Sequence, residues 1–266
     1  PVEVLEAASF GLGHKVVGQG GGGLIFGQDT PIDVELFFSY RSPYSYLSGP
    51  RTFALPDAFD VEIRFRGVIP MAMRGQAVPK SKRLHTLRDV DREARRLGMP
   101  FGHIHDPIGD GAMRCLLVSE HAVDEGRARE FVLAASRGIW AEAADVTDDR
   151  VLRAICEDAG LRWGACFAAI HDPAMRERVQ ANTDALAALP HWGVPVITFA
   201  GERYWGQDRI ADLEVALREA GRRMSSLGQG GLPQDVAEAV AWLSQPGSGA
   251  VSGQALRVCG QSLLGA

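Results

Sequence analysis

The stretch FFSYRSPYSYL, residues Phe37 to Leu47, lies where a predicted strand ends and a predicted helix begins. Pro43 suits the first helical position, because its missing N–H would have no acceptor there. Ser42 is then placed to cap the helix with its hydroxyl oxygen. Ser42 and Ser45 also have the spacing of a C-x-x-C pair. The stretch is therefore either an ordinary helix start or a functional corner in which serines replace two cysteines.

The composition is that of a globular chain. It has 266 residues, of which 46% are hydrophobic and 23% charged, enough for a sizeable core in one domain, or in one domain with appendages. The net charge of −5 gives no indication of a nucleic acid or other polyanionic partner. There is no long apolar run and no basic leader, so we expect a soluble, cytoplasmic protein without a membrane segment.

The cysteines and histidines predict neither a disulfide framework nor a metal site. No two of the four cysteines form a C-x-x-C pair, and they are Cys115, Cys156, Cys166 and Cys259. The nearest approach to a metal-ligand cluster is the run from His103 to Asp106, which is typical of a loop before Pro107. We therefore expect no bound metal.

Strand and helix patterns alternate from about residue 32. A strand is predicted over Asp33 to Ser39 and a helix from about Pro43, which Pro50 should kink or shorten. The run VEIRFRGVI, beginning at Val61, alternates apolar and charged residues and predicts a strand with one buried face. The order at this end is β-α-β.

From about 75 to 190 the pattern is helical. The run SKRLHTLRDVDREARRLG predicts a helix that ends at Gly98, with its basic residues on a solvated face. Its expected apolar stripe consists of Leu84, Leu87, Val90 or Asp91, Ala94 and Leu97. Four more helices are expected over 111–125, 127–144, 148–159 and 163–188, and Thr147 and Asp148 are candidate caps for the one over 148–159.

Strand patterns return after the helical block. VPVITFAG and ERYWG flank Ala200-Gly201 and predict a hairpin, and DRIADLEVALREAG predicts a last helix. Its expected inner face consists of Ile210, Leu213 and Leu217. A β-α-β unit followed by β-β-α is the order of the thioredoxin fold. We predict an α/β, thioredoxin-like domain over 32–221 with an all-helical insertion over about 75–190, an irregular segment over 1–31, and a helix-strand tail over 222–266.

The corner at Ser42 favours binding of an anion. A helix N-terminus carries unpaired N–H groups and partial positive charge, which stabilise anions and thiolates. Serines cannot form a disulfide, so redox exchange at this corner is excluded. The Ser42 hydroxyl can donate to a bound thiolate and lower its pKa. Val194-Pro195, a candidate cis peptide, and Asp208, at a later helix start, are expected to lie near this corner.

Three segments carry a family resemblance: FFSYRSPYSYL, VPKSKRLHTLRDVDREARRLGMPF and WGVPVITFAGERYWGQDRIADLE. Together they resemble the 2-hydroxychromene-2-carboxylate isomerase family, relatives of kappa-class glutathione transferases within the DsbA-like group, over about residues 33–220. The resemblance implies a glutathione-dependent isomerase, or a kappa-like transferase, acting on a small electrophile of the kind met in aromatic catabolism. It also implies a homodimer, as in typical relatives, and a place for glutathione or another small thiol.

The resemblance assigns site residues. Ser42 matches the catalytic serine that contacts the glutathione sulfur, and the expected cofactor-binding residues are Val194, Pro195, Gln207, Asp208 and Lys82. Two departures concern the substrate: Ser39-Tyr40-Arg41 stands where an Asp-Phe pair is usual, and His85 stands where a K-x-x-Y pattern has tyrosine.

The two ends differ from that family. LPQDVAEAVAWLSQP and GAVSGQALRVCGQ resemble the tail of a short-chain dehydrogenase/reductase of the 3-oxoacyl-carrier-protein reductase kind. The run Gly18 to Gly23 fits G-x-G-x-x-G but lacks the following helix and acidic residue of a nucleotide site, so a linker is favoured. Two alternatives stay open: a non-catalytic thioredoxin-like module that binds an extended peptide, and an NAD(P)-dependent reductase fragment.

Overall fold

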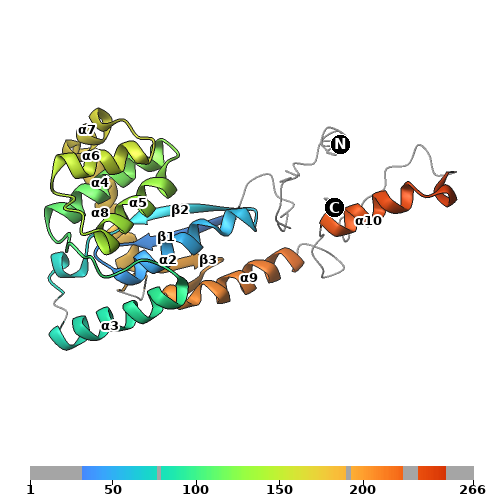
Figure 1. The fold of residues 1–266 in the computed structure, drawn as a ribbon, viewed down its shortest axis with the longest axis horizontal. Coiled ribbons are helices and arrows are strands. Elements are labelled where there is room, and N and C mark those ends of the chain that lie inside the picture. Colours follow the sequence, from blue (N-terminus) through green and yellow to red (C-terminus); the bar gives the residue numbers. More distant parts are fainter. Residues whose placement is uncertain (1–31, 77–78, 190–192, 224–232, 250–266) are drawn as a thin grey trace. The chain divides into compact units, whose positions relative to one another are not determined.

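A four-stranded sheet forms the centre of the fold. Its strands, in the order β2-β1-β3-β4, are β1 (Ile32–Phe38), β2 (Val61–Gly67), β3 (Val196–Phe199) and β4 (Glu202–Trp205). Strand β3 is antiparallel to both β1 and β4. The computed structural model describes residues 32–76, 79–189, 193–223 and 233–249 (Figure 1). The predicted segment 1–31 lies outside them.

The described chain falls into two units. One consists of 34–53 and 63–210, and the other takes in 54–62 with the described residues up to 33 and from 211 onward. All six residues assigned to the site belong to the first unit. The predicted division at 32 and 221 stays a prediction.

The β3–β4 hairpin has the tight turn that its sequence predicts. Ala200 and Gly201 have φ angles of 50° and 82°, as a two-residue turn with two left-handed positions requires. The pairing of Val196 with Trp205 then returns the chain to Pro195, whose carbonyl accepts a hydrogen bond from Gly206 N at 3.0 Å. The hairpin therefore places the residues after β4 beside Pro195.

Helix α2 (Pro43–Phe53) begins as predicted. Ser45 N donates to Ser42 Oγ at 3.2 Å, so Ser42 caps the helix. Pro50 does not end the helix at once, because helical structure continues for three residues beyond it.

Six helices form the described insertion: α3 (Lys80–Leu97), α4 (Asp110–Asp124), α5 (Ala128–Ala141), α6 (Asp149–Asp158), α7 (Trp163–His171) and α8 (Pro173–Ala188). Asp148 caps α6 as predicted by accepting from Arg150 N. The single helix predicted over 163–188 is wrong. Asp172 accepts a hydrogen bond from Ala174 N and Pro173 occupies the first position of α8, so a new helix begins there.

The apolar stripe predicted for α3 is also partly wrong. Val90 and Ala94 are buried and Gly98 ends the helix with φ 66°, but Leu84 and Leu87 are 49% and 38% exposed. Helix α3 packs through half-buried polar side chains as well as apolar ones, and those polar contacts concern the site described below.

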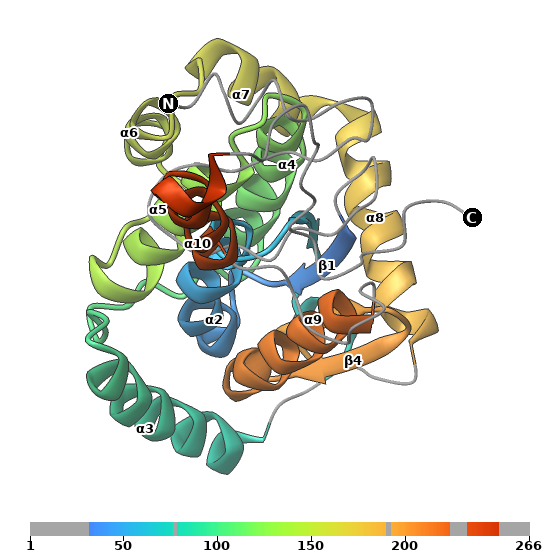
Figure 2. The ribbon, with the colours of Figure 1, turned by 90° about the vertical axis from the view of Figure 1, so that its right-hand side faces the viewer.

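The sheet has helices on both faces. In Figure 2, β1 lies between α2 and α8. Phe37, Val68, Leu186 and Val196 form a buried apolar cluster between α8 and the strands. Thr183 Oγ1 accepts from Ile69 N at 3.1 Å, which ties α8 to the end of β2. The predicted α/β, thioredoxin-like fold with a helical insertion is confirmed.

The second unit contains η1 (Leu55–Asp57), nearly all of α9 (Ile210–Arg223) and α10 (Pro233–Leu243). Leu213 and Leu217 are buried as predicted, and the Arg218 guanidinium lies 5.5 Å from the centre of the Phe59 ring. The strand predicted after α10 lies outside the described residues. Within the described chain, no helix combines the length and apolar character needed to cross a membrane.

Candidate thiol-binding site

The Ser42 hydroxyl joins two distant parts of the chain. Its Oγ accepts from Ser45 N and donates to the carbonyl of Val194 at 3.0 Å. The Val194-Pro195 peptide bond is cis, as predicted. Ser42 therefore caps α2 and also contacts the segment before β3, so the two alternatives for this residue do not exclude each other.

The start of α2 keeps a donor for an anion. The N–H of Ser42 donates to Ser39 O, Pro43 has no N–H, and the N–H of Ser45 bonds to Ser42 Oγ. Tyr44 is the second residue of the helix, where a backbone N–H has no intrahelical acceptor. An anion at this end would meet the Tyr44 N–H, the helix dipole and the half-buried Ser42 hydroxyl.

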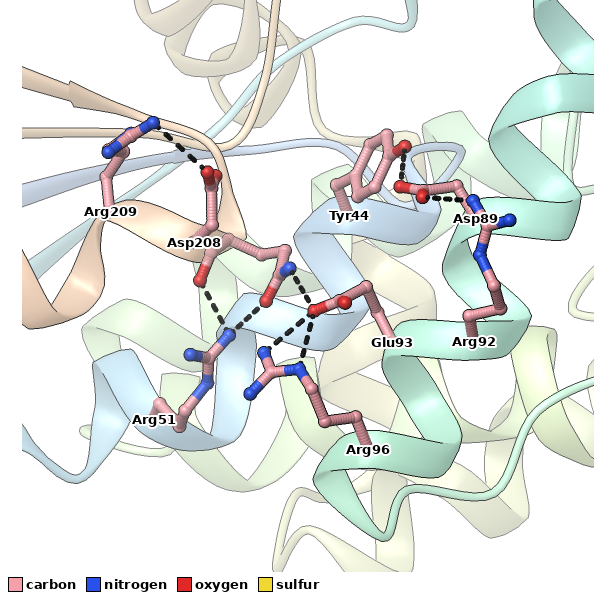
Figure 3. A network of polar contacts seen from close by, with 9 residues as sticks. Tyr44, Arg51, Asp89, Arg92, Glu93, Arg96, Asp208 and Arg209 are labelled. Carbon is pink, nitrogen blue, oxygen red and sulfur yellow. Dashed lines mark hydrogen bonds and ion pairs between the residues drawn. The ribbon is translucent and has the colours of Figure 1, made fainter.

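Gln207 and Asp208 follow β4 but differ in their surroundings. Gln207 is 4% exposed; its Nε2 donates to Glu93 Oε2 at 2.9 Å, and its carbonyl and Oε1 both accept from Arg51. Asp208 has an exposed carboxylate 3.4 Å from Arg209 Nη2. Figure 3 shows this arrangement. Gln207 therefore holds protein elements together, whereas the Asp208 carboxylate is accessible to a ligand.

Gly206 is required by the geometry before Asp208. Its φ of 109° is one that other residues rarely adopt, and a Cβ at this position would lie 2.5 Å from Asp208 Oδ1. The glycine lets the Asp208 side chain lie back against the main chain of the turn.

Two acidic residues of α3 complete the polar network, and neither belongs to the site predicted from the sequence. Tyr44 donates from its hydroxyl to Asp89 Oδ2 at 2.7 Å, and Arg92 donates to Oδ1 at 2.8 Å. Arg96 donates to Glu93 Oε2 at 2.7 Å (Figure 3). The four-residue spacing of Asp89 and Glu93 shows in the sequence that they share one face of the helix. It does not show which residues that face contacts.

Charge states in this network follow from its contacts. Hydrogen bonds from Arg92 and then Tyr44 lower the pKa of Asp89, and the bond from Arg96 is the main cause that lowers the pKa of Glu93. Burial raises the pKa of Tyr44, and its bond to Asp89 raises it further. At neutral pH both carboxylates are ionised and the Tyr44 hydroxyl keeps its proton.

The remaining predicted residue, Lys82, lies in the first turn of α3 with an exposed side chain. It precedes Asp89 by two helical turns and so shares its face of the helix. His85 is exposed as well.

The unusual residues before Ser42 have structural partners. Tyr40 is buried, its hydroxyl lies 2.5 Å from Ser119 Oγ in α4, and its carbonyl accepts from Trp140 Nε1 in α5. Burial raises the pKa of Tyr40 well above its ordinary value. Arg41 forms two hydrogen bonds with Asp106, at 2.8 and 2.9 Å. These residues anchor the corner to the helical insertion.

The described cysteines belong to the helical insertion and not to the corner itself. Cys115, Cys156 and Cys166 are all buried within helices of the insertion. Burial raises the pKa of Cys115 to about 12, so its thiol stays protonated at neutral pH. Cys259 lies outside the described residues. None of the three described cysteines lies on α2, on the segment before β3 or on the turn after β4.

Comparison with known proteins identifies the family. The model of the DsbA-like thioredoxin domain matches residues 33–218. A 2-hydroxychromene-2-carboxylate isomerase of Sphingobium xenophagum is 27% identical over 69% of this chain and 97% of its own length. A solved 2-hydroxychromene-2-carboxylate isomerase has a TM-score of 0.63 at 24% identity, over 72% of this chain and 97% of that one.

A further solved structure shares the fold: the cytosolic disulfide reductase DsbM of Pseudomonas aeruginosa with GSH, at TM-score 0.53 and 18% identity over 70% of this chain and all of that one. The family match ends before the tail, so it gives no support to the resemblance of residues 222–266 to a reductase. The family match covers residues 33–218, which is most of the chain, and the fold agrees with it. We conclude that this chain belongs to the DsbA-like thioredoxin domain family.

Proposed function

We propose that the protein is a glutathione-dependent isomerase of the 2-hydroxychromene-2-carboxylate type, acting on a small electrophilic molecule. The observation that carries the proposal is the Ser42 hydroxyl at the start of α2, 3.0 Å from the Val194 carbonyl, at a corner without cysteine. A relative 27% identical, matched over nearly its whole length, bears that isomerase name.

The residues present fit glutathione. The helix start offers the Tyr44 N–H and the Ser42 hydroxyl to a thiolate, the Val194 carbonyl is an acceptor for a peptide N–H, and Asp208 offers a carboxylate to an ammonium group. When bound, glutathione would supply a thiolate that adds to an unsaturated substrate and leaves after bond rotation, with no net oxidation.

The Ser42 hydroxyl can donate one hydrogen bond, and the Val194 carbonyl accepts it. We infer that, when a thiol binds, the Ser42 hydroxyl donates this hydrogen bond to the sulfur instead. The Val194 carbonyl then accepts a peptide N–H from the same extended ligand. This exchange lowers the pKa of the bound thiol, and the Val194 carbonyl keeps a hydrogen-bond donor after binding.

Ser42 itself is not the nucleophile in this proposal. Among the described residues, the two hydrogen-bond partners of its hydroxyl are a carbonyl oxygen and a backbone N–H, and neither acts as a general base. Its role is to stabilise the charge on sulfur. Asp208 binds the amino end of the cofactor, Gln207 positions that turn, and Lys82 is proposed to contribute from α3.

The test pairs binding with turnover. We expect glutathione to raise the melting temperature and NADPH to leave it unchanged, and we expect isomerisation of 2-hydroxychromene-2-carboxylate to depend on added glutathione. A shift with glutathione but no turnover on hydroxychromene-type substrates would favour the non-catalytic binding module. A shift with NADPH alone would favour the reductase fragment. The proposed homodimer is checked by light scattering after size exclusion.

A further inference from the structure

Two consecutive turns of helix α3 contact the two parts of the proposed thiol site, which are the start of α2 and the turn after β4. Asp89 accepts from the Tyr44 hydroxyl at 2.7 Å, and Glu93, four residues later, accepts from Gln207 Nε2 at 2.9 Å. Tyr44 lies two residues after Ser42, and Gln207 lies directly before Asp208. One face of one helix therefore reaches residues that are more than 160 positions apart.

The same network also links α2 to the turn after β4. Arg51, in the last turn of α2, donates to the carbonyl and to the Oε1 of Gln207. Tyr44 and Arg51 thus connect two ends of α2 to α3 and to the turn respectively, as Figure 3 shows. The contacts close a triangle of α2, α3 and the turn, which restricts sliding of any one of them.

We propose, on the basis of the function proposed above, that Tyr44 is a positioning residue of the thiol site. Its hydroxyl, held by Asp89, fixes the start of α2 relative to α3 and so sets the separation between Ser42 and the Asp208 carboxylate. A ligand that binds at both points needs that separation to be constant.

The charges around Tyr44 support this role. The phenol is surrounded by Asp89, Asp208 and Glu93, all of which raise its pKa after the larger effect of burial. It stays protonated and can act only as a donor to Asp89 at neutral pH. A neutral donor among carboxylates fixes one geometry without adding a charge that would compete with the cofactor's amino group.

The test uses substitutions that separate hydrogen bonding from charge. We expect Y44F and D89A to raise the KM for glutathione roughly five- to tenfold with kcat nearly unchanged, since both remove the hydrogen bond from the Tyr44 hydroxyl to a charged group. D89A also removes the bond from Arg92. D89N keeps an oxygen that can accept from Tyr44, so its KM should stay within about twofold of the wild type. The D91N variant, which alters an ion pair with Arg95 on the exposed part of α3, is the matched control.

The outcomes are distinguishable. If the wild type neither binds glutathione in a calorimetric titration nor turns over with it, the proposed function fails. If the wild type is active and Y44F and D89A keep its KM, the positioning role fails while the function stands. An equal loss in D89N and D89A would show that the charge of Asp89 acts instead, and would overturn the proposal. Thermal unfolding of all variants reports any general loss of structure.

Discussion

At the scale of single residues, Ser42 has a structural role at the start of α2 and a proposed chemical role in the thiol site. It caps α2 through Ser45 N and contacts the Val194 carbonyl, so a substitution affects both. We predict that S42A folds, losing about 1 kcal/mol of stability with the cap, and that glutathione-dependent turnover falls roughly ten- to a thousandfold. S42T, which keeps a hydroxyl, should retain most of the activity.

The control for this prediction is S48A. Ser48 is buried in the same helix, and its hydroxyl donates to Ser45 O at 2.8 Å, away from Val194. Its removal should change the melting temperature but leave the KM for glutathione and kcat as in the wild type. Steady-state kinetics of S42A, S42T and S48A test this prediction. Full activity in S42A would show that Ser42 is not part of the thiol site.

At the scale of elements, the break between α7 and α8 is set by two residues. Asp172 caps α8 by accepting from Ala174 N at 2.8 Å, and Pro173 follows it. We predict that D172A lowers the free energy of unfolding by about 1 kcal/mol, because the cap is lost while α8 still packs on the sheet. E177A, in the exposed middle of α8, should stay within about 0.5 kcal/mol of the wild type. Urea denaturation measures both, and equal values would contradict the cap's role.

Much of the element order could be predicted because it depends on local chemistry. Ser42, Asp148 and Gly98 each act within a few residues of their position, so sequence alone located these helix ends. The Asp172-Pro173 pair carries the same kind of local signal for a helix start, but it lies inside a long helical pattern that predicts no break there.

Tertiary partners were harder to predict. Asp89 and Glu93 looked like residues of a solvated face, since nothing local indicates that Tyr44 and Gln207 lie opposite. Leu84 and Leu87 fit a helical stripe but stay exposed, because periodicity shows which residues share a face and not how far along the helix a neighbour covers it. The site's outline was predictable from Ser42 and Pro195, and the α3 contacts were not.

At the scale of the larger unit, a chain of polar contacts runs from the insertion to the sheet. Glu120 of α4, 4% exposed, pairs with Arg178 at 2.9 Å and accepts from Asn182 at 2.7 Å. Asn182 in turn accepts from Arg66 on β2, at 3.2 Å, and Arg66 pairs with Glu35 on β1. The insertion is therefore attached to the strands by charged side chains as well as by the apolar cluster.

This network gives stability a specific dependence on pH. Burial raises the pKa of Glu120 above its ordinary value of 4.5, even though Arg178 and Asn182 act to lower it. Above pH 4.5 the unfolded chain loses this proton before the folded chain does, so the folded state binds more protons in that window. The contribution of Glu120 to stability is therefore complete below pH 4.5 and is lost as pH rises through its raised pKa.

We predict that the stability of the wild type relative to E120Q falls as pH rises from about 4 to about 7, because glutamine has no proton to lose over this range. Denaturant titrations of both proteins at steps of pH measure the difference, in which the opposite contributions of Asp89 and Glu93 cancel. E35Q is the comparison for a half-buried carboxylate in the same network, paired with Arg66. If the stability of the wild type relative to E120Q instead stays constant or rises with pH, Arg178 and Asn182 compensate fully for the burial of Glu120.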